Sequence, residues 1–334
     1  MSYKISIIGS GSWGSALAQI LSDNKHQVLM YDVDKNIVNE INKEHTNKSK
    51  FEDAKLNDDI KATSDLAKAV NFGDLILLAV PTAVIRAVLG KINKVIEDPK
   101  LFVNVAKGIE PETFKRVSEI VSEEIAESKR KGYVVLTGPS HAEEVVLGML
   151  TLVTAASNSL DDAKLVQKIF SNKENFRVYT STDLIGAELC GSLKNVIALA
   201  SGMAYALNFG DNSKAALITR GLVEIKRIVL ALGGKMETVY GLSGVGDLIV
   251  TCTSFHSRNF QAGIKIAQGK DLKQTLSEIT MVVEGARTAV AAHQIIKEYK
   301  ISAPIMEGVY DIVYKHKDVK KAIANLMARS LKSE

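Results

Sequence analysis

The chain has 334 residues, a formal net charge of +4, 46% hydrophobic residues and 24% charged residues, a length that favours two domains with ordinary apolar cores. Because the charge is modest and no apolar run is long enough to cross a bilayer, we expect neither nucleic-acid binding nor membrane insertion. Two cysteines, Cys190 and Cys252, are too few for a disulfide framework or a four-ligand metal site, so we interpret both as small buried hydrophobic residues and expect no metal.

The first half of the chain alternates short β-branched runs with amphipathic segments. The expected strands are Lys4 to Ile8, Gln27 to Tyr31, Asp74 to Val80, Leu101 to Val105, Tyr133 to Leu136, Thr151 to Ala155 and Phe176 to Tyr179. Between the first two, Leu17, Ile20 and Leu21 recur at the spacing of one helix face. This alternation predicts an α/β fold, with a mostly parallel sheet and helices on both of its faces. Since the first strand begins at Lys4, a signal peptide has no room, and we expect a cytoplasmic protein.

The pattern changes after Asp183, where β-branched runs become sparse and the periodicity turns helical to the end of the chain. We place the domain boundary near Ser181. The sequence therefore predicts a dinucleotide-binding domain over 1–182 and an all-helical substrate domain over 183–334.

The second domain is expected to begin with one long helix. Asp183 is a candidate N-cap, and the helical pattern continues to about Leu207. Gly186, Gly191 and Gly202 would each weaken this helix by about 1 kcal/mol relative to Ala. Glycines retained in such a helix suggest close approach of another helix or of a ligand.

A glycine-rich turn follows the first predicted strand, with the sequence GSGSWG at residues 9–14. In the strand-turn-helix context of a dinucleotide site, Gly9 permits the tight turn, Gly11 lets the backbone approach a pyrophosphate, and Gly14 allows close packing of helix on strand. Asp32 ends the second strand at the distance where an acid accepts hydrogen bonds from the adenosine ribose. The pattern predicts dinucleotide binding here.

Asp32 also bears on the choice of cofactor. Its charge would repel the additional phosphate of NADP, Val33 offers no compensating cation, and Lys35 compensates only in part. We therefore expect NAD, with NADP possible.

Two later strands are followed by loops with polar residues. Lys107 follows the strand Leu101 to Val105, and Gly138-Pro139-Ser140 follows the strand at Tyr133. Carboxyl ends of parallel strands are where open α/β folds bind ligands, so we expect the two loops to line one crevice.

Lys194 lies in the sequence GSLKN, among small and apolar residues of the predicted long helix. A lysine in this position can be a surface residue whose stem covers apolar neighbours. Alternatively, burial tunes it for proton transfer, which the oxidation of a secondary alcohol by hydride transfer requires.

A second polar segment, residues 241–259, combines glycines, an acid and hydroxyls with a terminal Ser-Arg-Asn. The guanidinium of Arg258 matches phosphate oxygens, and Ser257 and Asn259 add neutral donors, which favours a phosphate ligand. The alternative is a capped loop with a surface arginine.

Taken in order, the motifs GSGSWG, AKGIE, GPS, GSLKN, GVGDLIVTCT with SRN, and VVEG resemble the bacterial NAD(P)-dependent glycerol-3-phosphate dehydrogenase family. The likeness extends from Ile5 to about Tyr314. It implies an N-terminal Rossmann domain, an all-α C-terminal domain, a cleft between them and a homodimer. The implied reaction is reversible hydride transfer between NAD(P)H and dihydroxyacetone phosphate, giving sn-glycerol 3-phosphate for phospholipid synthesis.

The resemblance also implies roles for individual residues, with Lys194 as the general acid/base. The residues matching substrate contacts are Lys107, Gly138, Ser140, Lys194, Asp247, Ser257, Arg258 and Asn259, with Thr251 matching a further polar site residue of eukaryotic relatives. The residues matching cofactor contacts are Ser12, Trp13, Lys107, Gly138, Ala142, Arg258, Val282 and Glu284. His141 stands where family members often have Phe, so the shape of that pocket differs from the family pattern.

Two other functions remain open at this point. One is a related two-domain dehydrogenase for a β-hydroxy acid or a ketopantoate-like substrate, whose carboxylate would occupy the site of Arg258. The other is a protein that binds NAD without turnover. Lys194 with Asp247 and residues 257–259 favours an enzyme, because a pure binding protein does not need them.

Overall fold

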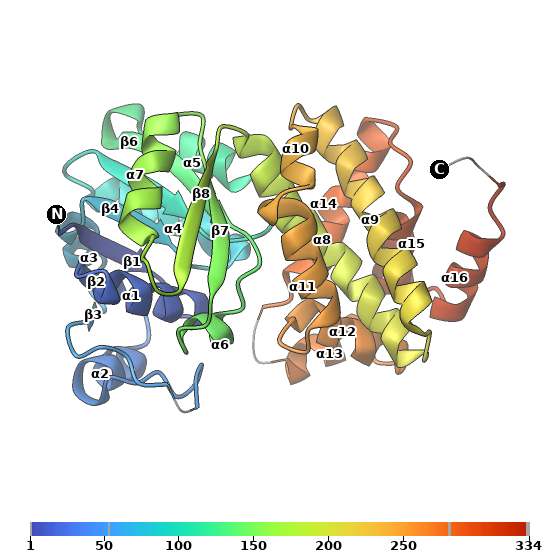
Figure 1. The fold of residues 1–334 in the computed structure, drawn as a ribbon, viewed down its shortest axis with the longest axis horizontal. Helices are drawn as coiled ribbons and strands as arrows, with labels where there is room; N and C mark the ends of the chain where they lie inside the picture. The colour runs from blue at the N-terminus through green and yellow to red at the C-terminus, as the bar shows by residue number, and fades with distance from the viewer. Residues whose placement is uncertain (1, 53, 280–281, 332–334) are drawn as a thin grey trace. The chain divides into compact units, whose positions relative to one another are not determined.

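The computed structural model describes residues 2–52, 54–279 and 282–331. The chain forms two compact units, the first made of Met1–Lys107 with Lys115–Glu188 and the second of Gly108–Phe114 with Leu189–Glu334. The first unit contains the sheet and the second is helical (Figure 1). The predicted fold class, an α/β domain followed by an all-α domain, is confirmed.

The sheet of the first unit has eight strands in the order β3-β2-β1-β4-β5-β6-β7-β8. The strands are β1 (Lys4–Ile8), β2 (Gln27–Tyr31), β3 (Lys61–Thr63), β4 (Leu75–Leu78), β5 (Lys100–Asn104), β6 (Arg130–Thr137), β7 (Thr151–Ala156) and β8 (Phe176–Ser181). All neighbouring strands are parallel except β6 and β7. The strand order reverses between β1 and β4, which is the point where open parallel sheets bind ligands.

Helices cover both faces of this sheet. Side chains alternate along a strand, so Leu75 and Leu77 of β4 pack in one core and Ile76 and Leu78 pack in another. The first core includes residues of α1, α2, α6 and α7, and the second includes residues of α3, α4 and α5. These helices are α1 (Ser12–Asp23), α2 (Lys35–Glu44), α3 (Leu66–Phe72), α4 (Thr82–Val95), α5 (Val117–Glu124), α6 (Ala142–Val145) and α7 (Leu160–Phe170). The two-sided packing explains why the central strands have continuous apolar runs.

The predicted strands agree with the structure in position, and β1 and β2 begin and end at the predicted residues. The later strands differ at their ends. The edge strand β3 was not predicted, because its sequence Lys61-Ala62-Thr63 is short and has no apolar alternation.

The second unit is built from helices (Figure 1), the first of which, α8, starts in the first unit and enters the second at Leu189. A π-helical turn at Leu242–Gly246 precedes α11. The helices are α8 (Leu184–Ala206), α9 (Asp211–Ala231), α10 (Met236–Val239), α11 (Asp247–Thr253), α12 (Arg258–Ala267), α13 (Leu272–Glu278), α14 (Glu284–Glu298), α15 (Pro304–Lys315) and α16 (Val319–Met327). The predicted cap of α8 is confirmed, since Gly186 N donates to Asp183 Oδ1 at 2.9 Å. In the part of the chain that the structure describes, α8 alone is long and apolar enough to cross a membrane, and 89% of its apolar window is buried. Burial of this extent is typical of a core helix of a folded domain.

Helices α8 and α12 touch through their backbones. A Cβ atom on Gly202 of α8 would lie 2.0 Å from the carbonyl oxygen of Phe260, and one on Gly263 of α12 would lie 2.1 Å from that of Leu199. The close helix approach that the sequence suggested at Gly202 is therefore confirmed.

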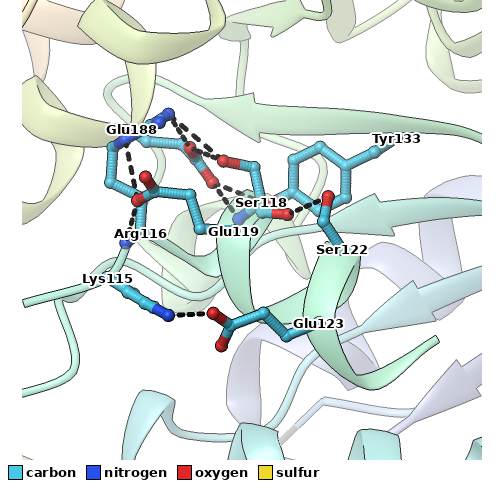
Figure 2. Close-up of polar contacts among 8 residues, drawn as sticks. All are labelled: Lys115, Arg116, Ser118, Glu119, Ser122, Glu123, Tyr133 and Glu188. Atoms are coloured by element: carbon cyan, nitrogen blue, oxygen red, sulfur yellow. Dashed lines mark hydrogen bonds and ion pairs between the residues drawn. The ribbon is translucent and has the colours of Figure 1, made fainter. Parts of the chain in front are cut away.

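The first turns of α8 are anchored by the buried carboxylate of Glu188 (Figure 2). It accepts hydrogen bonds from Ser118 N at 2.8 Å, Ser118 Oγ at 2.5 Å, Tyr133 OH at 2.7 Å and Arg116 Nη1 at 3.0 Å. Burial raises the pKa of Glu188, and the charge of Arg116 opposes that rise. All four residues belong to the first unit, so the cluster fixes the start of α8 within that unit, against α5 and β6. No sequence motif marks it.

Candidate active site

The turn between β1 and α1 forms a cradle that only glycine can build. Gly9 has φ +109°, and a Cβ atom there would lie 2.7 Å from the Ala79 carbonyl oxygen; at Gly14 it would lie 2.2 Å from the Gly9 carbonyl oxygen. At Gly11, by contrast, a Cβ atom would meet nothing within 4 Å. The helix α1 begins at Ser12, and its N-cap residue is Gly11, which has no side chain that could cap the N-terminus. The open space and the helix N-terminus fit a dinucleotide pyrophosphate.

The structure places Asp32 beside this turn, immediately after β2. Its Oδ2 accepts a hydrogen bond from Ser10 N at 3.1 Å, and its Oδ1 accepts one from Asp34 N at 3.0 Å. Ser12 and Trp13 form the first turn of α1, where Ser12 is buried and Trp13 packs partly against the core. Asp32 and the glycine turn, which are about twenty residues apart in the sequence, are therefore neighbours in the structure.

The loops after β5 and β6 also meet. Lys107 Nζ donates to the Gly138 carbonyl oxygen at 3.0 Å, and Ser140 Oγ donates to the same oxygen at 2.9 Å. Ala142 begins α6 just beyond them. The two loops that we expected to line one crevice are neighbours.

In the second unit, Lys194 is buried with a carboxylate and a hydroxyl as partners. Its residue is 5% exposed, and Nζ donates to Asp247 Oδ1 at 2.5 Å and to Thr251 Oγ1 at 2.6 Å. Asp247 and Thr251 lie one turn apart on α11, so both face the lysine. A surface lysine is excluded by this burial.

This arrangement is suited to proton transfer. Asp247 supplies the counter-charge that a buried ammonium requires, and Thr251 Oγ1 accepts from the lysine while it donates to the Asp247 carbonyl oxygen at 2.5 Å. Beside them, burial raises the pKa of Cys252 to about 12. Cys252 therefore remains a neutral thiol, and the expectation that both cysteines are buried is confirmed.

Asn259 joins three helices of the second unit. Its Nδ2 donates to Asn195 Oδ1 on α8 at 3.0 Å, and its Oδ1 accepts from Gly285 N on α14 at 2.8 Å. Asn259 is 8% exposed, so these bonds fix its carboxamide in one orientation. The amide next to Lys194 is thereby tied to the start of α14, where Glu284 lies.

The remaining predicted residues lie at the N-termini of α12 and α14. Ser257 caps α12, its Oγ accepting from Phe260 N at 3.2 Å. Arg258 is half-buried and donates from Nη1 to the His256 carbonyl oxygen at 3.3 Å. Val282 is exposed, two residues before α14 begins.

A metal centre is not evident in the geometry. Among residues 2–52, 54–279 and 282–331, no three His, Cys, Asp or Glu side chains are grouped so that they could hold a metal ion.

A glycine turn of the kind that binds dinucleotides and a buried lysine paired with a carboxylate are the features expected of one class of protein, the dinucleotide-dependent dehydrogenases. Family models agree with this class. The N-terminal model of NAD-dependent glycerol-3-phosphate dehydrogenase matches residues 4–163, and the C-terminal model matches residues 183–324. The chain belongs to this family.

Individual relatives give the same result. A protein of Acholeplasma laidlawii named glycerol-3-phosphate dehydrogenase [NAD(P)+] is 51% identical, with 99% of each chain covered. The crystal structure of glycerol-3-phosphate dehydrogenase from Coxiella burnetii matches with a TM-score of 0.92 and 33% identity, covering 98% of this chain and 99% of that one. A ketopantoate reductase family structure from Ralstonia eutropha, at 15% identity and a TM-score of 0.61 over 96% of this chain and 99% of that one, shares the fold alone.

Proposed function

We propose that the chain reversibly transfers hydride between NAD(P)H and dihydroxyacetone phosphate, giving sn-glycerol 3-phosphate for phospholipid synthesis. Full-length membership of the family supports the reaction class. The single structural observation that carries the proposal is the burial of Lys194 against Asp247 and Thr251.

Lys194 acts as the general acid/base. In the reducing direction its ammonium donates a proton to the carbonyl oxygen of dihydroxyacetone phosphate, and in the oxidising direction the neutral amine accepts the hydroxyl proton. The nicotinamide, when bound, supplies the hydride exchange with C2 of the substrate. Asp247 and Thr251 orient the lysine, and the negative charge of Asp247 stabilises its protonated form.

The phosphate of the substrate is bound by Arg258, with Ser257 and Asn259 as neutral partners. Arg258 is half-buried as a residue, and Asn259 Nδ2 carries a second hydrogen besides the one it gives to Asn195. Binding of the unreactive phosphate fixes the reacting carbon in place. The other residues matched by the family resemblance fall into two groups. We assign to the substrate site Lys107, Gly138, Ser140, Asp247 and Thr251. We assign to contacts with the cofactor Lys107, Gly138, Ala142, Arg258, Val282 and Glu284.

The dinucleotide occupies the GSGSWG turn, where Gly9, Gly11 and Gly14 provide the cradle and Ser12 and Trp13 start the helix. Asp32 favours NAD over NADP, because its carboxylate lies at the turn and repels a phosphate on the ribose. Catalytic efficiencies measured with NADH and NADPH test this preference. An efficiency with NADPH about tenfold or more above that with NADH, equal to about 1.4 kcal/mol, would contradict it.

The assembly and location of the protein follow from the family resemblance. We propose a cytoplasmic homodimer without membrane insertion, in which residues 1–182 bind the dinucleotide and residues 183–334 contribute the acid/base. The burial of α8 supports the absence of a membrane span. Sedimentation of the purified protein at several concentrations tests the dimer, and a monomer throughout would contradict it.

The decisive experiment follows NADH absorbance with dihydroxyacetone phosphate, beside ketopantoate and a panel of other keto acids at equal concentrations. We expect turnover with dihydroxyacetone phosphate to exceed that with every keto acid. Preference for a keto acid would favour the related dehydrogenase, whose likeness here is one of fold alone. NADH binding without turnover of any substrate would favour a non-catalytic binding protein.

A further inference from the structure

A buried asparagine, Asn47, lies against the glycine-rich turn although it belongs to the loop after α2. It is fully buried, with 0% of the residue exposed. Its Nδ2 donates to the Ser10 carbonyl oxygen at 2.7 Å and to Ser15 Oγ at 3.0 Å. Both hydrogens of the carboxamide nitrogen are therefore used on the turn and on the first turns of α1.

The asparagine is itself held in place. Its Oδ1 accepts a hydrogen bond from Ser49 Oγ at 3.2 Å, and its carbonyl oxygen accepts from Lys50 N and Phe51 N at 2.9 Å each. Phe51 is a buried member of the core of the first unit. The carboxamide is therefore a fixed donor.

Ser10 is held from a second direction as well. Its backbone N–H and its hydroxyl both donate to Asp32 Oδ2, the former at 3.1 Å. Asp32 therefore fixes the peptide group before Ser10 through its N–H, and Asn47 fixes the peptide group after Ser10 through its carbonyl oxygen.

The geometry of the peptide bond gives this contact a consequence for the cofactor. The C=O and N–H of a trans peptide point in opposite directions across one plane. Because Asn47 holds the Ser10 carbonyl toward the protein interior, the N–H of Gly11 is turned the other way. A Cβ atom at Gly11 would meet nothing within 4 Å, so this side of the turn is open.

We infer that Asn47 is a positioning residue for the dinucleotide, which orients the Ser10-Gly11 peptide so that the Gly11 N–H faces the pyrophosphate. The inference rests on the proposed function, because it takes the glycine turn as the phosphate site. Because Asn47 is fully buried, it would act through the turn and not by contact with the cofactor.

The test measures NADH affinity by fluorescence for wild type, Asn47→Ala and the near-isosteric Asn47→Asp, with steady-state kinetics on each. Neither replacement can donate to the Ser10 carbonyl when the aspartate is ionised. We expect Kd and KM for NADH to rise about tenfold, the effect of losing buried hydrogen bonds. The KM for dihydroxyacetone phosphate and turnover at saturating NADH should stay within about twofold.

Asn57 provides a matched control. Asn57 lies, like Asn47, in the segment 45–60 that connects α2 to β3. Its Nδ2 ties this segment to the C-terminal end of α1, donating to Ser22 Oγ at 3.2 Å and Asp23 Oδ1 at 2.7 Å. Asn57→Ala should leave NADH affinity unchanged. Thermal unfolding of every variant identifies those that are folded at the assay temperature.

Two results would overturn the inference. One is NADH affinity within about twofold of wild type in a folded Asn47 variant, and the other is an equal loss of affinity in Asn57→Ala, which would indicate general loosening of the segment. If both Asn47 variants fail to fold, Asn47 supports the fold and the positioning role is rejected. Failure of the wild type to bind NADH would instead refute the proposed function, and the inference with it.

Discussion

Replacement of Lys194 by methionine separates the catalytic role of the lysine from its part in a buried ion pair. Methionine matches the length of the lysine stem but has neither charge nor protons to transfer. In the folded protein Asp247, which is 1% exposed, would keep its burial and lose the ammonium 2.5 Å away. Two separate effects of the substitution are therefore expected.

The burial of the ion pair determines the loss of stability, and the proposed role of Lys194 determines the loss of turnover. A buried charge left without its partner lowers the free energy of unfolding by about 3–5 kcal/mol. Loss of a general acid/base lowers turnover by about 10²–10⁴. The double variant Lys194→Met with Asp247→Asn removes both charges, so it should recover most of the stability and none of the turnover.

The assays are denaturant unfolding and NADH oxidation with dihydroxyacetone phosphate, at pH 7 for wild type, both single variants and the double variant. The coupling energy from the double-mutant cycle measures the ion pair, and the turnover measures the chemistry. Near-normal turnover in a folded Lys194→Met variant would refute the assignment of Lys194. Stability equal to that of wild type in the same variant would refute the reasoning from burial.

Three further changes test other parts of the structure. Gly202→Ala should destabilise the protein by about 1–3 kcal/mol in denaturant unfolding, because the new methyl group collides with the Phe260 carbonyl, whereas Gly308→Ala in open space should not. Burial raises the pKa of Glu224 from 4.5 to about 7, so the folded protein holds this proton more tightly than the unfolded chain does. The free energy of unfolding of wild type, measured relative to Glu224→Gln, should therefore fall by about 3 kcal/mol from pH 4.5 to pH 7 and then level off. A difference between the two proteins that does not change with pH would contradict this. Arg258→Ala should raise the KM for dihydroxyacetone phosphate about tenfold or more in NADH assays, since charge-assisted bonds contribute about 1.5–3 kcal/mol each, and an unchanged KM would count against phosphate contact there.

Much of the fold could be predicted because the signals were local. The central strands are buried on both faces, so their β-branched runs stand out in the sequence, and the cap of α8 at Asp183 follows from residue type alone. The strand β3 could not be predicted, since Lys61, Ala62 and Thr63 form a strand only because the edge of β2 is available for pairing.

The candidate site shows the same division. The turn at residues 9–14 and the Lys194 segment are contiguous motifs whose chemistry can be inferred from their own residues. Asn47 and Glu188 carry no such motif, and their partners Ser10 and Ser118 lie 37 and 70 residues away in the sequence. Polar contacts over such distances are specified by the completed fold, so only the structure could identify them.

The crossing of α8 and α12 matters for engineering of this enzyme. At Gly202 and Gly263 the main chains of the two helices approach so closely that a side chain at either position would force them apart. A designer who diversifies α8 and α12 should therefore exclude these two glycines from the library, together with Lys194, Arg258 and Asn259, which the proposed mechanism uses.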